Sequence, residues 1–409
     1  MDDGTLIFHP ILGAYVLVDF LKVYEKTSDD RAIEYVEYLA EMLVQKGDNS
    51  YDELVFSYSE SDGLSSVPGQ FYSALTQAWY IKAFSQLSKH RPGKYDRALT
   101  RLWGSLLKPM SEGGVLVEKS YGWIVEEYPH APAFYTLNGW LTVIRWVIQS
   151  EPQLAKAGVD VKEFVDRNLD AVVHLLPLYD ARFVWNSRYQ LTGFTRLRLT
   201  CQTGSELRVR SMSVNIPGED PIDADMSGGS TSRWSTRLER SSSRRTQFNI
   251  VQSLVSYPEP NSVVVEMGTS ESTVVTVEIG EGQYSPDATG MPTTSWKTIA
   301  ELDCSPGEAS YSFEIPFDGI DLFAYPTNFK KVIDGVWYNG YHFVHVIDLA
   351  EIYAYSPRPL LREYALKWLE YIEHWPELSV LDDPKYSFES HVYGDKLERF
   401  VLKLMGEKA

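Results

Sequence analysis

The stretch FTRLRLTC (194–201) decides the fold, because the periodicity of the sequence changes there. Apolar and polar residues alternate along it, as they do in a β-strand with one buried face. The alternation returns in four later segments, separated by clusters of Gly, Pro, Asn and Ser: ELRVRSMSV (206–214), SVVVEMG (262–268), STVVTVEIG (272–280) and ASYSFEIPF (309–317). This spacing predicts an antiparallel β-sandwich from about Thr192 to about Asn328.

On both sides of this region the apolar residues recur at steps of three and four, which predicts amphipathic helices. The segments with this pattern are 12–24, 32–45, 71–87, 95–108, 133–150 and 161–176 before the sandwich, and 341–355 and 359–375 after it. Short polar connections favour antiparallel pairs of helices. We therefore expect an α+β protein in which residues 1–190 and 330–409 form an (α/α) barrel or toroid of helical hairpins, complete or incomplete. Residues 191–329 form an inserted antiparallel β-sandwich domain.

The net charge of −18 argues against a nucleic acid partner, because phosphate binding needs a basic surface. One local exception is RWSTRLERSSSRRT (233–246), which holds five arginines. Two interpretations stay open for it: a patch for a polyanionic ligand, or a solvated loop.

The N-terminal apolar run, FHPILGAYVLVDFL (8–21), is interrupted by Pro10, Tyr15 and Asp19 and is shorter than a membrane span. We expect no signal peptide and no membrane insertion. The cellular location stays undetermined, because a cytoplasmic protein and a trimmed secreted or lumenal form would look alike.

Cysteine and acidic residues offer little evidence for a metal. Cys201 and Cys304 are far apart and lack metal-ligand spacing, so we expect buried thiols, or a pair in an oxidising compartment. An acidic cluster in the predicted sandwich is either a calcium site or, as we favour, a solvated loop. Its members are Glu219, Asp220, Asp223 and Asp225.

Polar and aromatic clusters precede or open the third, fifth and seventh predicted helices: PGQFYS (68–73), EEYPHAP (126–132) and NGYHFVH (339–345). If the odd-numbered helices form the inner ring of a toroid, these clusters gather at one rim. The segment LPLYDARFVWNSRYQ (176–190) would emerge at the same rim. Helix N-termini favour anions, so such a cleft suits an acidic sugar.

These clusters, in this order, resemble the C-terminal domain of the D-glucuronyl C5-epimerase family, whose members convert glucuronic to iduronic acid in heparan-type polysaccharides. The resemblance rests on PGQFYSALTQA (68–78), EEYPHAPAFYTLNG (126–139), LLPLYD (175–180) and YHFVHVIDL (341–349). It implies an (α/α) barrel with β-sandwich material, an acidic polysaccharide substrate, no cofactor and a homodimer.

The resemblance also implies the site residues. Glu127 and Tyr128 match the family's E-E-Y-P motif, Tyr341 matches its Y-H-x-x-H motif, and Arg188 matches the arginine of a Y-D-L-R segment. Trp185 stands where that segment has a tyrosine, so Tyr179 or Tyr189 is expected to supply the hydroxyl. The substrate-binding residues expected in the cleft are Tyr72, Gln77, Asn138, Tyr179, Trp185, Tyr189, His342 and His345.

Epimerisation at C5 removes a proton next to a carboxylate and returns one to the opposite face. The carboxylate must be neutralised, and the fork of Arg188 suits it. Glu127 is the expected base, because desolvation raises a glutamate pKa toward neutrality. Tyr341 is the expected acid/base on the other face. His342 and His345 lie on adjacent turns like a metal pair, but no third ligand is near, so we expect no metal.

Two other functions stay open. A polysaccharide lyase would abstract the same C5 proton and then expel the C4 substituent by β-elimination. A non-catalytic carbohydrate-binding protein would use the sandwich and leave Glu127, Arg188 and Tyr341 without a role. The neighbouring sugar, its sulfation and the direction of net conversion are not encoded in recognisable motifs.

Overall fold

The computed structural model describes residues 8–49, 53–59, 69–182, 185–202, 204–228, 235–282, 293–317, 331–333, 336–338, 340–377 and 391–406. The chain divides into two compact units. The helical unit comprises Met1–Pro177, Phe343–Glu370 and Tyr393–Ala409, and the sheet unit comprises Leu178–His342 and Tyr371–Val392. The sheet unit is therefore longer than the predicted insertion of residues 191–329.

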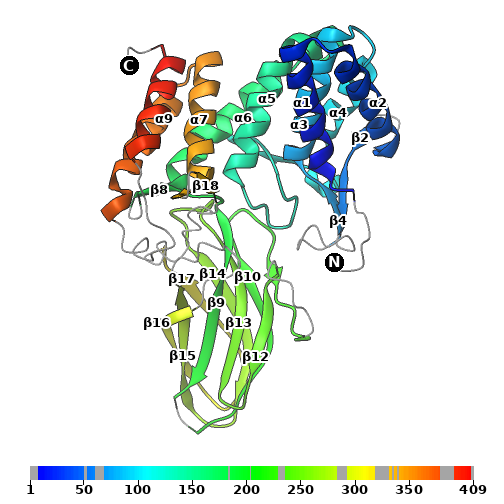
Figure 1. Cartoon of the computed structure of the whole chain (residues 1–409). Helices are drawn as coiled ribbons and strands as arrows, with labels where there is room; N and C mark the ends of the chain where they lie inside the picture. The colour runs from blue at the N-terminus through cyan, green and yellow to red at the C-terminus, as the bar shows by residue number, and fades with distance from the viewer. Residues whose placement is uncertain are drawn as a thin grey trace. The chain divides into compact units, whose positions relative to one another are not determined.

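All of the helical segments predicted above are helices in the structure (Figure 1). Their bounds are α1 (Pro10–Thr27), α2 (Asp30–Lys46), α3 (Ala74–His90), α4 (Asp96–Leu107), α5 (Leu137–Lys156), α6 (Lys162–Leu175), α7 (Gly340–Tyr355) and α8 (Pro359–Tyr371), followed by α9 (His391–Leu404). Two helices start later than predicted. Phe71 and Tyr72 belong to a strand ahead of α3, and the segment 133–136 runs up to α5 in an extended form.

The helices pack their apolar faces against neighbouring helices. In α4 the buried residues Leu99, Leu102, Trp103 and Leu106 follow the three- and four-residue steps of one helix face. Helix α3 packs against α1, α4 and α5, and α1 also packs against α2. Odd-numbered helices are thus neighbours of one another. Closure of these helices into a toroid stays a prediction.

Polar side chains join α5 to α7 in the helical unit. Asp348 of α7 is fully buried, and its Oδ2 accepts a hydrogen bond of 2.8 Å from Thr142 Oγ1. One guanidinium nitrogen of Arg145 lies 2.7 Å from Asp348 Oδ1. That approach lacks hydrogen-bond alignment, since Oδ1 has no hydrogen-bond partner among the described residues. Burial outweighs the attraction of Arg145 and raises the pKa of Asp348 to about 7.

Short strands accompany the helices. They are β1 (Asp48–Asn49), β2 (Leu54–Val55), β3 (Ser57–Ser59), β4 (Gln70–Tyr72), β5 (Leu116–Lys119) and β6 (Gly122–Val125) in the helical unit, and β7 (Asp180–Ala181), β8 (Asn186–Ser187), β18 (Lys331–Ile333) and β19 (Val336–Tyr338) in the sheet unit. They form two-stranded antiparallel pairs.

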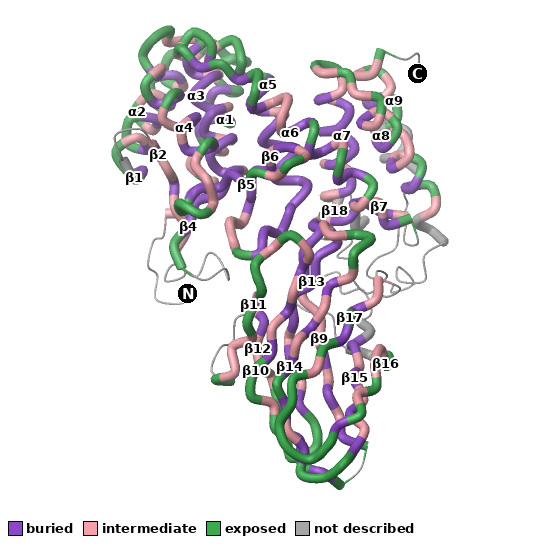
Figure 2. Tube along the Cα trace, turned by 180° about the vertical axis from the view of Figure 1, so that it is seen from behind, coloured by how far each residue is buried: buried purple, intermediate pink, exposed green. Residues whose placement is uncertain are grey.

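The sheet unit contains two larger antiparallel sheets that pack face to face (Figure 1). One has the order β11-β10-β14-β17 and the other β12-β13-β9-β15-β16. The strands are β9 (Thr192–Cys201), β10 (Leu207–Asn215), β11 (Ile222–Asp223), β12 (Arg237–Ser241), β13 (Arg245–Ser253), β14 (Asn261–Thr269), β15 (Thr273–Gly282), β16 (Thr293–Cys304) and β17 (Gly307–Ile315). Buried and more exposed positions alternate along β14 and along much of β9, β10, β13 and β15 (Figure 2).

One apolar core lies between the two sheets. Leu197, Leu199 and Phe248 reach it from the five-stranded sheet, and Val263 and Val265 from the four-stranded sheet. All five predicted strands are present. The arginine-rich segment is not a loop throughout: Arg237–Ser241 and Arg245–Ser253 pair as a hairpin that extends the sheet beside β9.

The cysteines are free thiols buried in the core, as expected, and burial raises the pKa of both. Within the described ranges, no helix is long and apolar enough to cross a membrane.

Candidate active site

The backbone of Glu126 is held from two sides. Its N–H donates to Val115 O at 2.9 Å, and its carbonyl accepts from Ala74 N, at the start of α3, at 3.1 Å. Strand β6 ends one residue earlier, at Val125. The glutamate pair therefore lies where a strand end and a helix start meet, and its position does not depend on a free loop.

The side chain of Glu126 is fully buried. Its Oε1 accepts a hydrogen bond of 2.9 Å from Tyr135 N, while Oε2 has no hydrogen-bond partner among the described residues. Burial raises the pKa of Glu126 to about 8, and the neighbouring charge of Glu127 adds to the shift. Near neutrality Glu126 therefore keeps its proton.

Glu127 is 8% exposed and lies against the first turn of α5. It hydrogen-bonds with the side chains of Tyr128 and Asn138. Burial raises the pKa of Glu127 to about 7, although these hydrogen bonds oppose the shift. Its Oε2 has no hydrogen-bond partner in the described part of the chain. A carboxyl with this pKa can accept a proton near neutral pH.

The segment between the glutamates and α5 is strained. Tyr135 is buried and has a φ of 57°, a left-handed conformation that costs a bulky residue about 1–2 kcal/mol. In this conformation its N–H donates to Glu126. His130 stacks on Phe134 with ring centroids 5.1 Å apart. The strained conformation of Tyr135 thus accompanies a hydrogen bond from its N–H to the buried carboxyl of Glu126.

Two tyrosines outside the predicted site, Tyr15 and Tyr58, lie within electrostatic range of Glu127. Burial raises the pKa of Tyr15, in α1, and the charge of Glu127 adds to that shift. The same two causes raise the pKa of Tyr58, in β3, to about 12. Tyr58 Oη and Thr76 Oγ1 are 2.9 Å apart. Both phenols are protonated near neutrality, so they can donate hydrogen bonds but cannot act as bases there. No motif surrounds either residue.

Tyr72 and Gln77, expected to bind substrate, make contacts within the protein. The Tyr72 hydroxyl donates to Ser105 O at 2.8 Å. Gln77 is fully buried; its Nε2 donates to Leu54 O at 2.6 Å and Ser105 Oγ at 2.8 Å, and its Oε1 accepts from Phe56 N at 3.2 Å. These contacts give both side chains a structural role, so neither is assigned to substrate.

Arg188 lies in the sheet unit and is 3% exposed. Its Nε donates to Leu178 O at 3.0 Å, and its backbone N–H donates to Tyr179 O at 2.7 Å. Tyr179 is fully buried. The backbone carbonyls of Leu178 and Tyr179, in the segment LPLYD, thus fix the orientation of Arg188.

Trp185 and the residues around it form an aromatic group in the sheet unit. Trp185 has a φ of 48° and stacks on His374 at 4.0 Å. Its ring also meets Tyr371 edge-on at 5.4 Å, and the Tyr371 hydroxyl donates to Asp180 Oδ1 at 2.7 Å. Trp185 therefore fills the position with an indole that packs, and it supplies no hydroxyl.

Tyr189 and Tyr341 contact each other, with ring centroids 4.9 Å apart. Both side chains are half-buried. The tyrosine expected as the acid/base group is therefore next to one of the two tyrosines expected to replace the family hydroxyl.

His342 and His345 are both fully buried. His342 Nδ1 accepts a hydrogen bond of 3.1 Å from Ser187 N and lies 2.8 Å from Ser187 Oγ. Because a backbone N–H can only donate, the neutral ring carries its proton on Nε2. His345 packs against Trp368. Across the described residues, no three His, Cys, Asp or Glu side chains form a metal-binding group, the acidic cluster at 219–225 included.

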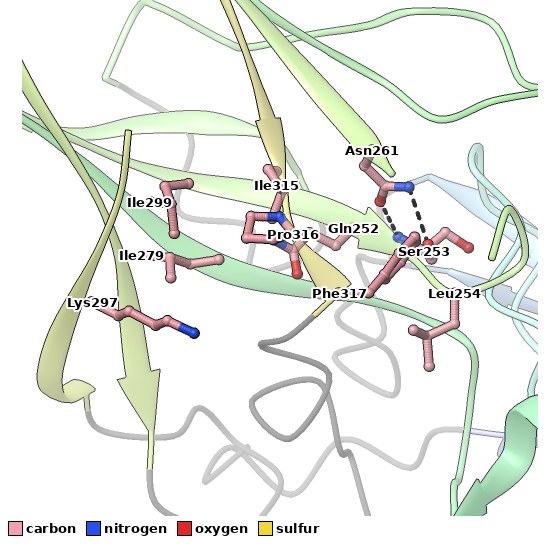
Figure 3. A pocket seen from close by; sticks show the side chains of 10 residues that line it. All are labelled: Gln252, Ser253, Leu254, Asn261, Ile279, Lys297, Ile299, Ile315, Pro316 and Phe317. Atoms are coloured by element: carbon pink, nitrogen blue, oxygen red, sulfur yellow. Dashed lines mark hydrogen bonds between the residues drawn. The ribbon is translucent and has the colours of Figure 1, made fainter. Parts of the chain in front are cut away.

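A hollow in the sandwich, drawn in Figure 3, is too small for a sugar. Its cavity volume is only about 10 Å³, which leaves room for about one water molecule. Its lining is mostly apolar, with Lys297 at the side. Asn261 Oδ1 accepts from Ser253 N at 2.7 Å, so the amide there is engaged.

The two units thus hold different parts of the expected chemistry. The helical unit brings Glu127, Tyr128 and Asn138 together at the start of α5, and the sheet unit contains Arg188 and Tyr341. A buried carboxyl that titrates near neutrality, next to phenol donors, is typical of enzymes that move protons.

The comparison with protein families gives a more specific assignment. Residues 46–204 match the model of the family described as D-glucuronyl C5-epimerase C-terminus. The matched segment covers less than half of the chain, and its similarity to this family supports a uronate epimerase function in general. It includes Glu127, Tyr128 and Arg188 and ends before Tyr341. No curated protein matches the chain.

Proposed function

We propose that the protein is a polysaccharide uronate C5-epimerase, which interconverts D-glucuronic and L-iduronic acid residues in a heparosan-like glycan. The observation that carries the proposal is Glu127, a buried carboxyl that titrates near neutrality within the family segment. Epimerisation needs a base that is ionised near neutral pH. It also needs the sugar carboxylate to be neutralised, because only then is the C5 proton acidic enough to remove.

Glu127 is assigned as the base that takes the C5 proton. The electron pair of the C–H bond moves toward the sugar carboxylate and forms an enolate. The phenols of Tyr15 and Tyr58 remain protonated near neutrality and do not compete for this role. Glu126 keeps its own proton to a higher pH than Glu127, so the two carboxyls are differentiated by their surroundings.

Arg188 is assigned to the sugar carboxylate. A guanidinium group presents two parallel donors to a carboxylate and remains charged at all relevant pH values. Its Nε is already used by Leu178 O, so the terminal nitrogens are the ones assigned to substrate. Neutralising the carboxylate acidifies C5, and the enolate that follows carries more charge on the same oxygens, which strengthens the interaction.

Tyr341 is assigned as the donor on the opposite face of the sugar. It transfers its hydroxyl proton to C5 and the enolate electrons return to carbon. The phenolate then regains a proton from solvent, and Glu127 releases the proton that it took. In the reverse direction the two residues exchange roles. Tyr189, in ring contact with Tyr341, is assigned to position it.

The test is incubation with a heparosan-like polymer in heavy water. We expect deuterium at C5 of the uronate, with both epimers present and the chain length unchanged. Accumulation of ultraviolet-absorbing unsaturated ends would instead make the protein a lyase. If there is neither exchange nor cleavage while the polymer still binds, the protein is a non-catalytic carbohydrate-binding protein.

A further inference from the structure

Arginines gather on one outward face of the sandwich. Leu197, Leu199, Phe248 and Ile250 point into the core, so by alternation the residues between them point outward. The pairing of β12 with β13 sets Arg237 opposite Asn249 and Arg240 opposite Gln247, on that same face. The outward arginines of β12, β13 and β9 are Arg196, Arg198, Arg237, Arg240 and Arg245, and we call this set the arginine face.

Only part of this charge is neutralised. Arg198 makes two hydrogen bonds of 2.6 Å to Glu278, and Arg196 and Arg237 each lie 3.4 Å from Glu239. Two carboxylates thus serve three of the five arginines. Arg240 and Arg245 are exposed, and within the described residues neither guanidinium group has a hydrogen bond or ion pair.

The turn between β12 and β13 adds one more arginine. Arg244 is exposed, and its guanidinium group likewise has no hydrogen bond or ion pair within the described residues. Arg240 and Arg245 are diagonal neighbours across the β12–β13 pair, and such positions lie about 7–8 Å apart. That is within the Debye length of roughly 8 Å at physiological ionic strength, so these cations repel one another. Their clustering therefore does not stabilise the fold.

The outward face of the other sheet has the opposite charge balance. Glu266, Glu308 and Glu314 lie on β14 and β17, and Arg210 is paired with Glu308 at 2.6 Å. Arg208 is paired with Glu206 at 3.3 Å. The excess of cations is thus confined to β9, β12 and β13, because the next strands of the same sheet carry Glu278, Glu301 and Asp303. It occurs in a chain whose net charge is −18.

We propose that the arginine face is a second binding site, which holds a stretch of the anionic polysaccharide through its carboxylate or sulfate groups. The ligand class rests on the proposed function. Each guanidinium fork fits a carboxylate or sulfate oxygen pair. The face is three strands wide, with about 10 Å between the outer strands, which suits one flexible glycan chain. A nucleic acid duplex is wider and would bring its phosphates against the acidic remainder of the protein.

The test uses two variants that remove the same charge from opposite faces. Arg240→Gln with Arg245→Gln changes the arginine face, and Arg208→Gln with Arg210→Gln is the matched control. Both pairs are introduced into the Glu127→Gln protein, so that turnover does not change the probe. Binding to unsulfated heparosan is measured as a function of salt concentration, and thermal unfolding checks that both variants fold.

We expect the arginine-face variant to bind the polymer about tenfold more weakly, with a smaller salt dependence, and the control to stay within about twofold. With Glu127 restored, the KM for long polymer should rise while that for a short oligosaccharide stays unchanged.

Equal weakening in both variants, or unchanged binding in both, would overturn the proposal. Stronger binding of single-stranded nucleic acid than of heparosan would overturn the ligand class. The binding assay needs no turnover, so a protein without C5 exchange can still pass it, and the two proposals fail separately.

Discussion

Gly139 and Glu127 are in direct contact at the start of α5. A Cβ atom added to Gly139 would lie 2.5 Å from Glu127 Oε2, 2.8 Å from its Cβ and 3.1 Å from its Cδ. These distances are shorter than van der Waals contacts, so only glycine leaves room for the carboxyl. The first turn of α5 is therefore shaped around the candidate base.

Gly139→Ala should displace the Glu127 side chain. Because α5 has favourable helical geometry there, the backbone should tolerate alanine, and the added methyl group should cost about 1–3 kcal/mol through overpacking. A base moved by about 1 Å should lose on the order of 100-fold in kcat/KM. The measurements are thermal unfolding and C5 exchange.

The control is the same substitution in a protein that lacks the Glu127 side chain. In the Glu127→Gly protein, Gly139→Ala should cost much less stability, because the Cβ and the carboxyl that the methyl group would meet are both absent. Equal costs in both backgrounds would show that the helix itself, and not Glu127, requires glycine at this position.

The elements that were predicted correctly share a strong period. The helices and the strands β9, β10, β14, β15 and β17 place several large apolar residues on one face. Of the missed strands, β12 and β16 do not, whereas β13 turns Phe248 and Ile250 to the core. In β12 only Leu238 is apolar, and in β16 a bulge between Lys297 and Ala300 shifts the alternation, because Glu278 pairs with Thr298 and Val277 with Ala300. Strand β13 follows a run of serines and arginines that suggests a loop.

The candidate site was predictable only where the residues that determine its chemistry are adjacent in the sequence. Two neighbouring glutamates before an aromatic run indicate a raised pKa, and both carboxyls have one. Tyr15 and Tyr58 come near Glu127 through tertiary packing, which no local pattern reveals. Gln77 is in the first turn of α3, yet that turn is buried, and position along the helix does not tell which way a side chain faces.

Arg188→Lys should keep the charge and lose the two-point contact with the sugar carboxylate. We expect kcat/KM to fall by two to three orders of magnitude, which corresponds to roughly 3–4 kcal/mol of transition-state stabilisation. Arg182→Lys, at an exposed position of the same segment, is the control and should keep its activity. Near-normal turnover of Arg188→Lys, with both variants folded, would remove Arg188 from the mechanism.

Asp348→Asn should change how stability depends on pH. The pKa of Asp348 is raised to about 7 in the folded protein, from 3.8, so the folded state holds its proton when the unfolded state has lost it. The stability contributed by Asp348 is therefore complete below about pH 4 and is lost as pH rises to about 7. Over that window the difference in unfolding free energy between wild type and variant should shift by roughly 3–4 kcal/mol in favour of the variant. Chemical denaturation at several pH values measures it; a constant difference would mean that Asp348 stays ionised beside Arg145.

The last prediction distinguishes Glu127 from Glu126 by pH. A general base works only when ionised, and the pKa of Glu127 is about 7, so kcat/KM should fall about tenfold for each pH unit below 7. Glu126 has the higher pKa, about 8, so it remains neutral while Glu127 titrates. Glu126→Gln replaces a neutral acid with a neutral amide and should leave the acid side of the profile near pH 7. Glu127→Gln should fold and show no C5 exchange at any pH. Activity in Glu127→Gln together with its loss in Glu126→Gln would move the base one residue earlier, to the carboxyl that accepts from Tyr135 N.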